Sequence, residues 1–103
     1  MKRYILVLQF PFSSMDDYHA MIQLEDDLDR SLCRLAEVDG HDAGSGEMNV
    51  FIFTDDAQQT FEEAEFVVKR SSLFLRGAAF RLVEGEEYTR LWPINSIQPF
   101  IVM

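Results

Sequence analysis

The sequence predicts an α+β protein in which two amphipathic helices cover one face of an antiparallel sheet. Residues 3–10 and 48–54 are rich in β-branched and aromatic residues and apolar on both alternating faces, as expected of central strands. Residues 15–34 and 57–75 instead place apolar residues at the spacing of a helix. Strand and helix patterns therefore alternate along the chain, which favours a mixed layered architecture.

The first strand is closed by Pro11, and the helix start follows directly. Ser14 with Asp17 three residues later resembles a capping box in which aspartate replaces the usual glutamate. We expect the helix to run from Met15 to about Arg34. Its apolar stripe consists of Met21, Leu24, Leu28, Leu32 and Leu35.

A glycine-rich segment then leads into the second central strand. Gly40, Gly44 and Gly46 tolerate positive φ, so we expect a hairpin or bulged loop between residues 35–38 and 48–54. Phe51 or Phe53 should be part of a packed surface on the sheet, with its strand neighbour facing the helices. Thr54, Asp55 or Asp56 can cap the next helix.

The second helix is expected at residues 57–75, with Gly77 as its C-terminal cap. Strands are predicted at 79–83 and 88–92, separated by a turn at 84–87. The apolar tail, 94–103, is expected to be ordered against the sheet or a partner chain, because the helices leave one face uncovered.

The order β-α-β-β-α-β, with right-handed crossovers, gives a ferredoxin-like arrangement with a C-terminal strand or tail extension. A length of 103 residues corresponds to a single domain, residues 1–103.

Charge narrows the classes of partner. Acidic residues outnumber basic ones 18 to 9, and the formal net charge is −9. Such a chain repels phosphate backbones and attracts basic proteins, so we expect no nucleic-acid partner.

We also expect no membrane span and no signal peptide, because the apolar run after Lys2 and Arg3 is short. Cys33 is the single cysteine and is expected to be a buried thiol, which suits a cytoplasmic location.

His41, with Asp39, Asp42 and Glu47, is the best candidate for a metal or acid–base cluster. The spacing matches no established metal motif, and a solvated turn is the favoured interpretation. We therefore expect no catalytic residue, metal or cofactor.

The remaining candidates are carboxylates that could contact a basic partner, together with two aromatic side chains that could anchor it. They are Glu25, Asp26, Asp29, Asp39, Asp42, Glu47, Glu84, Glu86, Glu87, Tyr88 and Trp92.

Two segments of the chain resemble a group of small bacterial single-domain proteins. The first is Val-Asp-Gly-His-Asp-Ala-Gly-Ser-Gly-Glu-Met-Asn-Val-Phe-Ile at 38–52, continued by Phe-Thr-Asp-Asp at 53–56. The second is Tyr-Thr-Arg-Leu-Trp-Pro at 88–93. Some proteins of this group are similar to immunity proteins encoded beside polymorphic toxins, including contact-dependent growth inhibition systems. The resemblance implies a toxin-neutralising role. Together with the acidic charge, it leads us to expect a non-enzymatic protein that binds a basic toxin, for example a nuclease, in a 1:1 complex. It assigns no catalytic residue.

Two alternatives remain open. One is a small enzyme or ligand-binding domain that uses the loop around His41 and Glu47 or the open face of the sheet. The other is a homodimeric structural domain.

Overall fold

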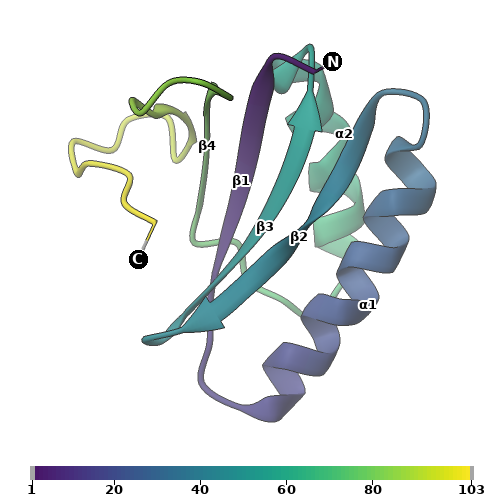
Figure 1. Ribbon diagram of the computed structural model, residues 1–103. Helices are drawn as coiled ribbons and strands as arrows, with labels where there is room; N and C mark the ends of the chain where they lie inside the picture. The colour runs from purple at the N-terminus through teal and green to yellow at the C-terminus, as the bar shows by residue number, and fades with distance from the viewer. Residues whose placement is uncertain (1, 103) are drawn as a thin grey trace.

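The computed structural model describes residues 2–102 as two helices and a five-stranded antiparallel sheet (Figure 1). The elements are β1 (Tyr4–Pro11), α1 (Met15–Leu32), β2 (Ala36–Gly44), β3 (Glu47–Thr54), α2 (Ala57–Arg70), β4 (Gly77–Leu82) and β5 (Thr89–Trp92). The strands are ordered β2-β3-β1-β4-β5. The α+β class is as predicted, and the arrangement is compatible with a ferredoxin-like fold.

The two apolar strands lie inside the sheet, as predicted. β1 pairs with β3 on one side and with β4 on the other. Leu6, paired with Ile52, and Leu8, paired with Val50, belong to the buried core between sheet and helices. That core is completed from α1 and α2, whose buried residues include Met21, Leu24, Leu28, Leu32, Phe61, Ala64, Val67 and Val68.

Both helix starts are capped by side chains that the sequence singles out. The Ser14 hydroxyl accepts a hydrogen bond from the backbone N–H of Asp17, and Asp56 accepts one from the N–H of Gln59. Each bond satisfies one N–H that the first helical turn leaves without an intrahelical partner.

The predicted end of the second helix is wrong. α2 ends at Arg70, and the backbone N–H and hydroxyl of Ser71 both donate to the Val68 carbonyl. Gly77 is not a helix cap but the first residue of β4. A β-carbon there would lie 3.3 Å from Arg90 Nη1 and 3.4 Å from the Trp92 carbonyl oxygen, so the strand is closely packed at this glycine.

The glycine-rich segment is strand rather than loop. β2 continues to Gly44 and pairs with β3 along its length, interrupted by a bulge between Val38 and Gly40. Only Ser45 and Gly46 form the turn, with φ of 53° and 78°. The predicted hairpin therefore exists, but with longer strands and a shorter loop.

Two further findings concern single features. Cys33 is exposed at the C-cap of α1, so the expectation of a buried thiol is wrong. Within residues 2–102 no helix has the length and apolar character needed to cross a membrane.

Candidate interaction surface

The sheet face turned away from both helices, here called the open face, carries a partly buried apolar strip. Alternate side chains of a strand point to opposite faces. Because Val50 and Ile52 lie in the core, Phe51 and Phe53 lie on the open face, as predicted. Ile5 pairs with Phe53 from the neighbouring strand. All three are partly buried, and together they are termed the aromatic strip: Ile5, Phe51 and Phe53.

The C-terminal tail, residues 93–102, covers the adjoining part of the open face. The Gln9 side-chain amide donates to the backbone oxygen of Ile101 at 2.9 Å. The Phe100 ring lies 5.2 Å from that of Tyr88 and under the Arg90 guanidinium at 5.4 Å. The tail begins after β5, at the sheet edge remote from β2 (Figure 1). The predicted contact between tail and sheet is present at Phe100 and Ile101, whereas Ile97 is 95% exposed.

The uncovered strip is bordered by carboxylates of β2. Glu37 pairs directly with Phe53, and Asp39 lies in the bulge beside Gly40, which pairs with Phe51. Asp42 pairs with Asn49 at the end of the strip. All three carboxylates are exposed, and they are termed the acidic border: Glu37, Asp39 and Asp42. An apolar centre with a charged rim is the usual anatomy of a protein interface.

A polar network lies beside the aromatic strip, where β3 begins. Asn49 is fully buried, and its amide nitrogen donates to Asp42 at 2.9 Å and to Glu47 at 3.0 Å. Its oxygen accepts from Gln9 at 3.1 Å. The Glu47 side chain is 8% exposed, with Arg76 Nη1 at 3.9 Å. Glu47, predicted to contact a partner, is therefore an internal residue that supports the sheet.

His41 does not join the carboxylates with which the sequence groups it. Its strand position pairs with Val50, so its side chain lies on the helix side of the sheet. Nδ1 is 2.7 Å from a Glu25 carboxylate oxygen and Nε2 is 3.3 Å from the Tyr18 hydroxyl. The candidate cluster of His41 with Asp39, Asp42 and Glu47 does not form, because His41 lies on the helix side whereas Asp42 and Glu47 lie on the open face with Asn49.

The Tyr18–His41–Glu25 contacts fasten α1 to β2. Tyr18 and Glu25 are seven residues apart, which places them on one side of the helix. That spacing is the signal that could have identified the pair. The Glu25 side chain is 16% exposed, so this carboxylate is engaged within the fold rather than displayed to a partner.

The other predicted carboxylates separate into two groups at opposite edges of the sheet. Asp26 and Asp29 are exposed on α1, which packs against the edge strand β2. Glu84, Glu86 and Glu87 are exposed in the turn between β4 and β5, beside the other edge.

The two predicted aromatic anchors are partly used inside the fold. Tyr88 packs against Phe100, and its hydroxyl accepts from Arg81 Nε at 3.4 Å. Trp92 packs against the hydrophobic core and pairs with Ala78. Phe51 and Phe53 of the aromatic strip are likewise partly buried, and their alternation with Val50 and Ile52 is visible in the sequence.

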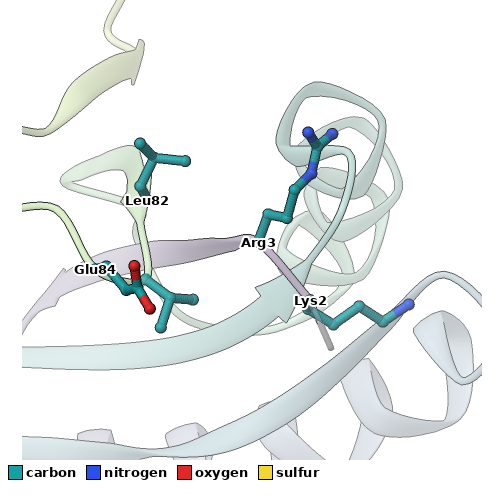
Figure 2. Close-up of a pocket in the computed structure, with 5 residues that line it drawn as sticks. Lys2, Arg3, Leu82 and Glu84 are labelled. Atoms are coloured by element: carbon teal, nitrogen blue, oxygen red, sulfur yellow. The ribbon is translucent and has the colours of Figure 1, made fainter.

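Figure 2 shows a shallow pocket of about 280 Å³ between the start of β1 and the turn after β4. Lys2, Arg3, Leu82, Val83 and Glu84 line it. The charged ends of Lys2 and Arg3 point away from Leu82 and Glu84, and both bases lie within 4.0 Å of Asp55. With its cations directed outwards and a carboxylate on its wall, this pocket does not suit an anionic ligand.

Residues 2–102 contain no group of three or more histidine, cysteine or carboxylate side chains positioned to hold a metal ion. Comparisons with protein-family models, with curated proteins and with solved structures find no match for this chain.

Proposed function

We propose that this chain is an immunity protein that binds and neutralises a basic toxin domain in the cytoplasm, as a 1:1 complex and without catalysis of its own. The resemblance of the 38–56 and 88–93 segments to small bacterial proteins, some of which are similar to immunity proteins, supports a toxin-neutralising role. The observation that carries the proposal is the group of carboxylates at the edge formed by α1 and β2.

This edge displays Asp26 and Asp29 from α1 beside the acidic border of β2. Among the residues that the structure describes, none of these five carboxylates forms an ion pair. Asp29 and Glu37 line one shallow hollow, so the helix and strand groups adjoin. Unpaired exposed carboxylates raise the rate of encounter with a cationic protein.

A toxin that acts on nucleic acid needs a basic site to hold phosphates. An acidic surface that occupies this site competes with the substrate for the same cations. Inhibition then needs no catalytic group on the inhibitor, which fits the internal role of His41 and Glu47.

The test uses the protein encoded beside this gene as the candidate toxin. Cells that express its toxic domain should survive when this chain is co-expressed, and the purified pair should associate faster at low ionic strength. Asp26→Asn with Asp29→Asn and Glu37→Gln should slow association by roughly tenfold. The matched control, Glu84→Gln with Glu86→Gln and Glu87→Gln, removes the same charge at the opposite edge and should change the rate less than twofold.

A toxin neighbour that is not bound, or an association rate indifferent to salt and to both triple variants, would contradict the proposal.

The Tyr18–His41–Glu25 contacts are the structural argument for the enzymatic alternative. The imidazole contacts a carboxylate through one ring nitrogen and a hydroxyl through the other. Five pockets of the region 2–102 are lined by other residues. If His41→Ala removed a measured turnover and left the chain folded, the enzymatic alternative would replace the immunity proposal.

A further inference from the structure

The open face is divided into a closed part and an uncovered part. Val7 and Ala79, which pair with each other, are completely buried next to Gln9 and Arg90, residues of this face that contact the tail. Ile5, two residues before Val7 on β1, and Phe51 and Phe53 on the neighbouring β3 keep part of their surface exposed. The aromatic strip is therefore the part of this face that the chain itself leaves available.

The charges on either side of the strip differ in availability. On the β2 side, Glu37 and Asp39 are exposed and form no ion pair with any described residue. On the β4 side, Arg81 pairs across from Ile5. Its Nη1 donates to the backbone oxygens of Leu82, Val83 and Gly85, so this cation is engaged in its own turn.

From this asymmetry we infer that the aromatic strip and the acidic border together form the docking surface for the basic partner. The occupant is a segment of that partner in which arginine or lysine alternates with apolar side chains. Apolar side chains of such an extended segment pack on Phe51 and Phe53, while its cations reach Glu37 and Asp39. This inference deepens the proposed function and rests on it for the identity of the partner.

A second copy of the chain fits this surface poorly. Two copies stacked through their open faces would oppose chains that each carry a net charge of −9. Arg81 would have to leave three carbonyl oxygens to neutralise the border of the other copy. A basic segment from another protein neutralises the border without that loss.

The spacing of the border supports an extended occupant. Glu37 and the bulge at Asp39 face successive open-face positions of β3, namely Phe53 and Phe51. Each aromatic ring thus has a carboxylate beside it on the neighbouring strand. An extended partner segment places a side chain on the same face at every second residue. That repeat matches the two-residue spacing of Phe51 and Phe53 on β3.

The first experiment uses the full chain and a synthetic eight-residue peptide of alternating arginine and leucine. Titration followed by ¹H–¹⁵N NMR should give saturable shifts centred on Phe51, Phe53 and their β2 neighbours. The same peptide with glutamate in place of arginine should give none. Saturable shifts centred instead on the β4–β5 turn, or no saturation with the arginine peptide, would overturn the inference.

Charge reversal then tests the border. Glu37→Lys with Asp39→Lys should weaken peptide binding by about tenfold or more, and both sites are exposed, so the fold should be retained. Glu84→Lys with Glu86→Lys makes the same charge change at the opposite edge and should alter the dissociation constant less than about twofold. Equal weakening by the two variants would show that only net charge matters and would overturn the inference.

The anchor and the occupant are tested separately. Phe53→Gln should weaken peptide binding even at high salt, where Phe53→Leu should retain most of it. Sedimentation should find a monomer; a dimer that Phe53→Gln dissolves would identify a second copy as the occupant and overturn the inference.

Two outcomes distinguish this inference from the proposed function. If the neighbouring toxin binds and depends on Asp26 and Asp29 but not on Glu37 and Asp39, the immunity role stands and this surface does not. If the arginine peptide binds at the strip while no basic toxin is neutralised, the surface stands and the immunity role does not.

Discussion

At the scale of single residues, Asp17 links the end of β1 to the start of α1. Its carboxylate accepts from the Ser13 backbone N–H at 2.9 Å and from the Ser13 hydroxyl at 3.0 Å, while its own N–H donates to Ser14. The sequence predicts a capping box here, in which the carboxylate would return to the Ser14 N–H. The structure shifts that bond by one residue, to the Ser13 N–H.

These bonds lower the pKa of Asp17 below its usual 3.8, chiefly through the Ser13 backbone N–H and then through the Ser13 hydroxyl. A depressed pKa stabilises the folded chain above the unfolded value, and the contribution is lost as pH falls through the folded value. We expect carboxyl ¹³C titration to show this depressed pKa. Ser13→Ala, which keeps the backbone donor, should raise it only partway, and Asp17→Asn should make stability less dependent on pH in the acid range. A pKa at or above 3.8 would contradict the assignment.

His41 makes side-chain contacts that could not be predicted from the sequence. Its two ring nitrogens contact Glu25 and Tyr18, which lie 16 and 23 positions away along the chain. The sequence places Asp39, Asp42 and Glu47 much closer, but strand alternation and the bulge send those side chains elsewhere. Proximity along a strand is therefore a poor guide to a cluster, because a shift of one residue changes the face.

At the scale of elements, the strands and helices themselves follow from local patterns. The apolar runs predict the central positions of β1 and β3, and Met21, Leu24, Leu28 and Leu32 predict the buried side of α1. The end of α2 is less visible, because Leu73 and Leu75 continue a helical-looking apolar pattern. They instead pack against the core from an extended connection. Tertiary contacts override the local preference there.

The tail offers a test at this scale. Deleting residues 99–103 removes the Phe100 ring from Tyr88 and Arg90 and the Ile101 oxygen from the Gln9 amide. The lost hydrogen bond contributes about 0.5–1.5 kcal/mol and the packing of Phe100 adds to it, so urea unfolding should move to lower concentration by at least that free energy. Dye binding to apolar surface should rise, because Val7 and Ala79 lose their cover.

A shorter truncation supplies the control. Deleting only residues 102–103 keeps Phe100 and Ile101 and should change stability much less. Equal stability of the full chain and the 99–103 deletion, with no added dye binding, would show that the tail does not protect the open face.

At the scale of the whole molecule, the order of strands decides which charges act together. The sequence presents three acidic stretches without stating their relation. The order β2-β3-β1-β4-β5 places the carboxylates of β2 and α1 at one edge and those of the β4–β5 turn beside the other. A composition of 18 acids against 9 bases therefore predicts the sign of a partner, whereas the fold selects the surface.

The same imbalance predicts how the whole chain responds to salt in the absence of any partner. A net charge of −9 repels itself more strongly in the folded chain, where the carboxylates are closest together. Raising sodium chloride from about 0.01 M to about 0.15 M shortens the screening length from about 30 Å to about 8 Å. The exposed pairs of Asp55 with Lys2 and Arg3 lose little by this, because such surface pairs contribute little to stability. We therefore expect net stabilisation, and a gain of about 0.5 kcal/mol would raise the melting temperature by roughly 2–4 °C in a chain of this size.

The variant Glu84→Gln with Glu86→Gln and Glu87→Gln carries three fewer negative charges and should show a smaller rise, since these three carboxylates no longer need screening. A melting temperature that falls with salt over this range, or an equal rise in the variant, would show that self-repulsion does not limit the stability of the fold.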